Sequence, residues 1–178
     1  MEAHYFDIET YSPNEKPDPK NDTIITIQFQ KIDLKTGEKI GKLHILKQWE
    51  KTEEEIVKII YKWFFSRNPW IFIPIGFNLV FEWEFLSEKF KKYNLLNENI
   101  DYFIKKYPQI DLKSIAIINK GEFIGASLSS ISNKNDDGNI IKELYENKEF
   151  KKIEQYIENE TNSFIELYVK LKNKIKEI

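Results

Sequence analysis

The sequence predicts an α/β fold with a mixed central sheet, in which three antiparallel strands are followed by parallel strands. Three observations support this fold class. Three strand-like segments come first along the chain. They are followed by a helix, a strand and another helix. Apolar residues then recur at helical spacing through most of the C-terminal half. We therefore expect helices flanking the sheet, a helical C-terminal half, and a single domain over residues 1–178.

The N-terminal part of the chain is predicted to form the three antiparallel strands. The first is "HYFDIETYS" (4–12), and the polar segment 12–22, with three prolines, is a predicted surface loop. Residues 23–32 alternate between apolar and polar side chains, and a turn at Gly37 leads to a third strand at 41–47. The apolar face of the second strand is expected to comprise Ile25, Ile27 and Phe29.

A helix is predicted for residues 52–65. Thr52 is a suitable N-cap, and Glu55 completes a capping box with it. The apolar stripe of this helix is expected to comprise Ile56, Ile59, Ile60 and Trp63.

The rest of the chain contains one more predicted strand and then helices. Residues 70–78 are apolar on both faces, which is typical of a central strand. A helix from Val80 to Tyr93 follows, and a long amphipathic helix is predicted for residues 150–176. Residues 131–139 read as a solvated loop rather than a domain boundary.

Composition excludes several classes of protein. With 41% hydrophobic residues the chain can build a core, and without cysteine it cannot form disulfides or zinc–thiolate sites. The N-terminus is polar and no apolar run approaches the ~18 residues of a membrane span, so we expect a cytoplasmic protein. The net charge of −2 gives no general attraction to nucleic acid, and Arg67 is the only arginine.

Two acids lie within the first predicted strand. Alternation places Tyr5, Asp7 and Glu9 on one face, and the predicted topology makes this strand central and poorly solvated. Two buried like charges cost several kcal/mol unless a positive group lies between them. The alternative is an acid-rich strand edge exposed to water.

Two further acids lie on apolar helix faces. Glu82 shares a stripe with Leu79, Trp83 and Leu86, whereas Glu84 is turned about 200° away and should be solvated. Glu82 could instead lie at the rim of the stripe and extend into water. The last helix repeats this pattern, with Glu160 in the middle of its apolar face. That face comprises Ile153, Tyr156, Ile157, Phe164, Leu167, Tyr168 and Leu171.

Asp7, Glu9, Glu82 and Glu160 would therefore converge from three separate elements. Such a cluster would be strongly destabilising unless cations fill it. Oxygen ligands without cysteine or histidine select hard ions, Mg²⁺ or Mn²⁺. Two such ions about 3.5–4 Å apart can clamp the attacking and leaving oxygens of a phosphodiester displacement.

Three motifs in order resemble the DEDD-type 3′–5′ exonucleases, a family with an RNase H-like fold. "FDIET" resembles the first motif, and "GFNLVFEWEFL" (76–86) is similar to the second, with Asn78 followed by Phe81 and Glu82. "YIENETNSFIELYVKL" resembles the third, in which a tyrosine precedes an acid by one helical turn. The resemblance runs almost end to end, and it places the chain in the tyrosine branch, like the proofreading exonuclease domains of family-B DNA polymerases.

The resemblance implies a role for individual residues. Asp7, Glu9, Glu82 and Glu160 would ligate two divalent metal ions, and Tyr156 would orient or help to activate the attacking water. Without the resemblance, Tyr156 could equally be a core residue on an apolar stripe. Positions that usually contact or frame the terminal nucleotide correspond to Thr10, Asn78 and Phe81.

The sequence departs from the family at two positions, because the second and third aspartates are Glu82 and Glu160 here. One added methylene moves a carboxylate by up to ~1.5 Å, and a misplacement of ~1 Å can cost on the order of 100-fold in rate. Asp111 could substitute as a ligand, although an N-cap role is the better expectation.

The resemblance implies a metal-dependent 3′–5′ exonuclease that acts on single strands or frayed 3′ ends of DNA or RNA. The two glutamates leave open a catalytically weak or silent module that binds nucleic acid or a protein. An endonuclease of related architecture is a third alternative, which Tyr156 disfavours. Lys105, Lys106 and Lys134 are candidate phosphate contacts, although they could equally form a solvated face.

Overall fold

A mixed sheet forms the centre of the computed structural model, which describes residues 2–14, 16–65, 67–120 and 140–175. Within these residues the sheet has five strands in the order β3-β2-β1-β4-β5. Their bounds are Ala3–Tyr11 (β1), Thr23–Ile32 (β2), His44–Lys47 (β3), Ile73–Gly76 (β4) and Ile110–Asp111 (β5). Strand β1 pairs antiparallel with β2 and parallel with β4. The predicted mixed sheet with a central first strand is therefore confirmed.

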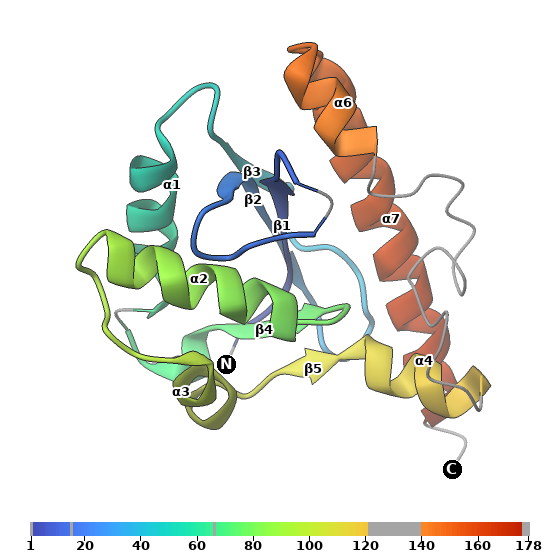
Figure 1. Cartoon of the computed structure of the whole chain (residues 1–178). Coiled ribbons are helices and arrows are strands. Elements are labelled where there is room, and N and C mark those ends of the chain that lie inside the picture. The colour runs from blue at the N-terminus through green and yellow to red at the C-terminus, as the bar shows by residue number, and fades with distance from the viewer. Residues whose placement is uncertain (1, 15, 66, 121–139, 176–178) are drawn as a thin grey trace.

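Helices cover both faces of the sheet. They are α1 (Glu53–Ile60), α2 (Val80–Lys92), α3 (Ile100–Lys106), α4 (Leu112–Lys120), α6 (Ile140–Glu146) and α7 (Phe150–Ile175). Figure 1 shows α1 and α2 on one side of the sheet and the antiparallel pair α6 and α7 on the other. The helical C-terminal half and the long last helix agree with the sequence pattern.

The two faces of β1 bury different residues. Phe6 and Ile8 belong to the core that α1 and α2 cover. Tyr5 packs on the other face against Phe164 of α7, with ring centroids 4.8 Å apart. Because alternate residues of a strand share a face, Asp7 and Glu9 point toward α7 as Tyr5 does.

Local signals in the sequence identify the start of α1 and the first hairpin. Thr52 caps α1, and its side chain and that of Glu55 form the predicted capping box. Gly37 has a φ of +83°, the left-handed conformation expected of it in the turn. A Cβ there would also lie 2.6 Å from the side chain of Val169, so any other residue would clash.

The predicted stripe of α1 is wrong at its end. Ile56 and Ile60 are buried, but Trp63 is 40% exposed, while Phe64 and Phe65 enter the core instead. The helix changes to a π-helical turn at Tyr61–Phe65. A π turn holds more residues than an α turn and so shifts the later side chains around the axis.

Two predicted strands are shorter in the structure. The segment 70–78 begins with a 3₁₀ turn at Pro69–Ile71, which Asn68 caps, so that β4 occupies only Ile73–Gly76. The third strand begins at His44 rather than at residue 41.

The predicted face of Ile25 is wrong, because β2 has a β-bulge at this residue. The register of β1 and β2 shifts between Glu9 and Thr10, and Ile25 is the extra residue on β2. As a result Ile25 packs with α6 and α7, whereas Ile27 packs in the core on the other face. Such bulges re-aim side chains, and this one lies directly beside Glu9.

Some features of the sequence fall outside this description. Lys134 and the predicted loop 131–139 lie outside the described residues. Among the helices that are described, none combines the length and the apolar character that crossing a membrane requires.

Candidate active site

Three carboxylates meet between β1 and α7. One oxygen each of Asp7, Glu9 and Glu160 lies within 4.8 Å of the others. Asp7 and Glu9 point toward α7 because they share a strand face with Tyr5, and the contact of Tyr5 with Phe164 holds α7 against that face. Glu160 lies one helical turn before Phe164 and therefore projects toward the same strand. The structure thus brings together three of the four predicted acids.

The fourth acid, Glu82, lies at the start of α2 and is only 3% exposed. Burial, then the negative charge of Asp7 and a hydrogen bond with Asp7, raise the pKa of Glu82 well above its usual range. Its Oε2 atom has no hydrogen-bond partner among the described residues. Glu82 is therefore turned inward beside Asp7, whereas Glu84 is exposed as predicted.

Asp7 is held in place by two neutral donors. The Tyr5 hydroxyl donates to Asp7 Oδ2 over 3.1 Å, and Gln28 Nε2 donates to the same oxygen over 3.0 Å. Thr26 Oγ1 donates in turn to Gln28 Oε1 over 2.9 Å, which orients the amide. Partners of this kind fix the direction of a ligating carboxylate.

Sequence reasoning did not assign a role to Tyr5 or Gln28. Tyr5 could have been found because it shares the strand face of Asp7. Gln28 is fully buried and lies opposite Asp7 in the β1–β2 register, a pairing that only the structure provides.

Tyr156 lies one turn before Glu160 on α7 and is 8% exposed. Burial raises its pKa strongly, and the charges of Glu160, Glu9 and Asp7 and a hydrogen bond with Glu160 add to this effect. The hydroxyl therefore stays protonated at any physiological pH. In the metal-free protein it can therefore donate a hydrogen bond or orient a water molecule.

Asp111 has a structural role. Its carboxylate accepts from the backbone N–H groups of Asn78, Leu79 and Lys113, each over 2.9 Å. It therefore caps α4, as predicted, and also fixes the turn that leads into α2. It is not a member of the carboxylate group formed by Asp7, Glu9 and Glu160 within the described part of the chain.

Of the three predicted nucleotide-contacting residues, Thr10 lies near the end of β1, Asn78 in the turn after β4, and Phe81 in the first turn of α2. Thr10 follows the bulge on β1, and Asn78 has a φ of +71° in the turn before α2. Phe81 is half-buried, with its ring 4.8 Å from that of Phe85. Lys113 Nζ donates to Asn78 Oδ1 over 2.8 Å and so places a positive charge beside this turn.

Lys105 and Lys106 are predicted to contact phosphates. No contact described in the structure links either of them to the nucleotide-contacting residues named above. Lys105 and Lys106 occupy the last turn of α3. Lys106 lies over the rings of Tyr102 and Tyr107, at 4.6 and 5.6 Å from their centroids. A role in binding phosphates stays a prediction for both.

The donor set fits a hard divalent cation. The group of Asp7, Glu9 and Glu160 offers only carboxylate oxygens, which suit Mg²⁺ or Mn²⁺. Glu82 adds a buried oxygen that lacks a partner beside this group. A cation would satisfy that oxygen and offset the repulsion among the four acids.

Replacing Glu82 with glutamine should change how stability depends on pH. The raised pKa means that folded Glu82 keeps its proton above about pH 4.3, where the unfolded chain releases it. In EDTA the wild type should therefore lose stability as pH rises from about 4 toward the folded pKa, by at most ~1.4 kcal/mol per pH unit. Glu82→Gln should lack this loss and become the more stable protein at neutral pH.

Denaturant unfolding of both proteins between pH 4 and 8 checks this. Glu84→Gln, on the exposed face of the same helix, is the matched control and should follow the wild type. Parallel profiles for the wild type and Glu82→Gln would show that Glu82 is not strained in the metal-free protein.

Comparison with known proteins identifies the fold. No family model and no curated protein sequence matches the chain. A structure of exonuclease I with the inhibitor BCBP has a TM-score of 0.51 at 12% identity, covering 66% of this chain and 30% of that one. The structure of E. coli exonuclease I with a dT13 oligonucleotide has a TM-score of 0.50 at 13% identity, covering 67% of this chain and 29% of that one. A structure of apo exonuclease I has a TM-score of 0.50 at 14% identity, covering 77% of this chain and 34% of that one.

The chain has an RNase H-like exonuclease fold. The expected fold class is thereby confirmed, because 66–77% of this chain matches these structures with TM-scores of 0.50–0.51. The matched region spans about a third of the length of exonuclease I. At identities of 12–14% the likeness concerns the fold, and the chemistry of this chain has to be argued from its own residues.

Proposed function

We propose that the chain is a metal-dependent 3′–5′ exonuclease of the tyrosine branch. The observation that carries this proposal is the meeting of Asp7, Glu9 and Glu160 within 4.8 Å, with Glu82 buried beside Asp7. Four inward acids on an exonuclease fold have a simple explanation if they hold divalent cations. The order of the three sequence motifs supports the same function.

In this proposal Asp7, Glu9, Glu82 and Glu160 hold two ions, Mg²⁺ or Mn²⁺. When bound, such ions stabilise negative charge on the attacking and leaving oxygens of a phosphodiester. Tyr5 and Gln28 keep Asp7 in one orientation through their hydrogen bonds. The carboxylates then need little reorganisation when the substrate binds.

Tyr156 is proposed to position the attacking water. Its hydroxyl stays protonated, and Glu160, one turn further along α7, is its neighbour in the site. A water molecule that accepts from this hydroxyl would be directed by it toward the scissile phosphate. In this proposal the proton released in the attack passes to water or to a carboxylate.

The proposed substrate is the 3′ end of single-stranded DNA or RNA. E. coli exonuclease I was crystallised with a dT13 oligonucleotide, which supports single-stranded DNA as a ligand for this fold. Thr10, Asn78 and Phe81 are proposed to frame the terminal nucleotide. Lys113 beside Asn78 could attract its phosphate.

A catalytically silent module that binds nucleic acid or a partner protein is the second candidate. The two glutamates at positions of family aspartates favour it, and Glu82, although it contacts Asp7, is not one of the three carboxylates within 4.8 Å of one another. Glu160, by contrast, reaches this group in spite of its extra methylene. The chemical question is therefore whether Glu82 also contributes to a metal site.

Labelled oligonucleotides distinguish these candidates. We expect 5′-labelled single strands to shorten stepwise and 3′-labelled ones to release mononucleotides, with Mn²⁺ or Mg²⁺ and not with EDTA. Asp7→Asn, purified in parallel, controls for a contaminating nuclease. Intact DNA and RNA in both metals would favour the silent module, and internal cuts would indicate an endonuclease.

A further inference from the structure

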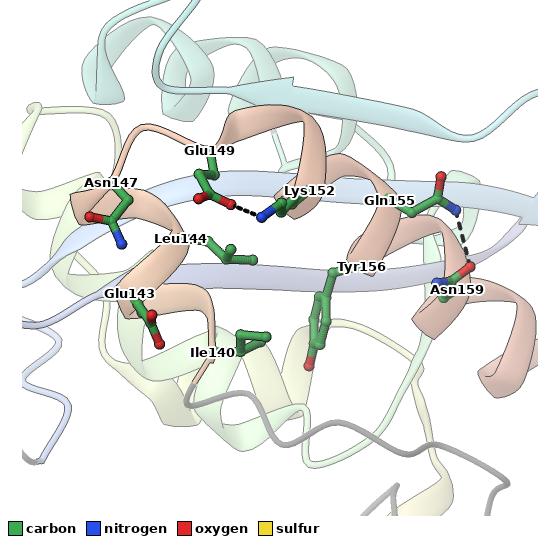
Figure 2. A pocket seen from close by; sticks show the side chains of 9 residues that line it. All are labelled: Ile140, Glu143, Leu144, Asn147, Glu149, Lys152, Gln155, Tyr156 and Asn159. Carbon is green, nitrogen blue, oxygen red and sulfur yellow. Dashed lines mark hydrogen bonds and ion pairs between the residues drawn. The ribbon is translucent and has the colours of Figure 1, made fainter.

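A cavity of about 360 Å³ lies between α6 and α7. Tyr156 lines it, so the cavity borders the residue that we place beside the acids. Ligand pockets in proteins span roughly 300–1,000 Å³, so this volume suits one small ligand and not a run of several nucleotides. Figure 2 shows Tyr156 with Ile140 and Leu144 of α6 on one side and Asn159 of α7 on the other.

The apolar part of the cavity can hold a flat ring. Ile140 and Leu144 contribute aliphatic side chains from α6, and Tyr156 contributes an aromatic ring from α7. Aromatic side chains of this kind contact bases in proteins that bind single-stranded nucleic acid, although Tyr156 is only 8% exposed here. This wall therefore favours a planar, weakly polar ligand.

Three of the six polar residues of the lining are carboxamides. Asn147 directly follows α6, and Gln155 and Asn159 come from α7 on the opposite side of the lining (Figure 2). Gln155 Nε2 donates to Asn159 Oδ1 over 3.2 Å, which holds the two amides in a fixed relative orientation. The Nδ2 group of Asn159 and the Oε1 atom of Gln155 then remain as a donor and an acceptor, and the edge of a nucleobase presents the complementary pair.

The charged residues of the lining disfavour an anion. Glu143 and Glu149 contribute two carboxylates, and Lys152, ion-paired with Glu149, contributes one ammonium. The excess of negative charge would repel a phosphate group. A nucleotide bound here would therefore insert its base and leave its phosphate outside, on the side of the acids.

We propose that the cavity between α6 and α7 is a subsite for one nucleobase of the substrate, recognised by the carboxamides of Asn147, Gln155 and Asn159. The proposal rests on the proposed nuclease function for its substrate, and adds a site that reads the identity of a base. Tyr156 would then contact the base with its ring and the attacking water with its hydroxyl.

Binding of free nucleosides to the whole chain tests this proposal. The probes are deoxyadenosine, deoxyguanosine, deoxycytidine and thymidine, titrated in EDTA and followed by NMR. They carry no phosphate, so binding does not depend on the acids. We expect the preferred nucleoside to bind at least about fivefold more tightly than the weakest one, the low end of discrimination by a paired amide.

A variant that fills the cavity provides the decisive comparison. Asn159 is exposed, so Asn159→Phe can fill the space without disturbing the core, and it should weaken binding at least about tenfold. Asn173→Phe, at an exposed position further along α7, is the matched control and should bind as the wild type does. Equal binding of the four nucleosides, or binding that Asn159→Phe leaves unchanged, would overturn the proposal.

The result is independent of nuclease activity. If the protein binds nucleosides but leaves oligonucleotides intact, the proposed subsite is supported and the proposed nuclease function is refuted. Metal-dependent degradation by a protein that binds none of the four nucleosides would remove the subsite alone.

Discussion

Asp7→Asn is expected to lower the rate of nucleotide release by more than about 100-fold, a larger loss than outer-shell partners of a metal site typically cause. Asp7 lies at the centre of the site, near Glu9 and Glu160 and against Glu82. Its replacement removes a negative ligand oxygen while keeping the shape of the side chain. Single-turnover degradation of a 5′-labelled single strand measures the loss.

The fold should survive this change. Tyr5 and Gln28 both donate to Oδ2, and the amide oxygen of asparagine can accept from the same two donors. Its NH₂ group can then donate to the neighbouring carboxylates. Asp101→Asn, on the exposed side of α3, is a suitable control and should keep its full rate. A rate for Asp7→Asn within a few fold of wild type would exclude Asp7 as a metal ligand.

Tyr156→Phe is expected to lower the rate by about 10- to 1000-fold, the range of positioning and proton-transfer contributions. The ring keeps its packing, so the melting temperature should change little. Because the pKa of Tyr156 is raised, its hydroxyl acts as a protonated group. The pH–rate profile of the variant should therefore have the same shape at alkaline pH as that of the wild type.

Tyr168→Phe provides the comparison for this variant, since Tyr168 is also a buried tyrosine on α7. It should retain the wild-type rate. If Tyr156→Phe keeps its rate but melts markedly earlier, Tyr156 is a structural residue, as an apolar stripe alone would suggest.

The sequence predicts most of the architecture, because local signals determine it. Alternation in the first two strands, the capping box at Thr52 and the spacing of apolar residues in the last helix are all present in the chain itself. The inward position of Glu82 follows in the same way from helical periodicity. Each of these depends on neighbours within a few residues.

Other features depend on how distant segments meet. The bulge at Ile25 reflects the register of β1 against β2, and the contact of Gln28 with Asp7 follows from that register. The π turn after α1 serves the packing of Phe64 and Phe65 in the core. Strand β5, Ile110–Asp111, is too short to produce a periodic pattern. None of these can be read from periodicity.

The stability of the wild type and Asp7→Asn, melted in EDTA and in Mn²⁺, tests most directly whether the acids form a metal site. Binding to the folded state adds about 2.7 kcal/mol at 100 times Kd, and 1 kcal/mol raises the Tm of a chain of this length by about 2–4 °C. We expect Mn²⁺ to raise the Tm of the wild type by about 5–10 °C at that concentration and that of Asp7→Asn far less. In EDTA the variant should be at least as stable as the wild type, because one repelling charge is gone. A wild type that is insensitive to Mn²⁺, together with a destabilised Asp7→Asn, would contradict the assignment of these acids to a metal site.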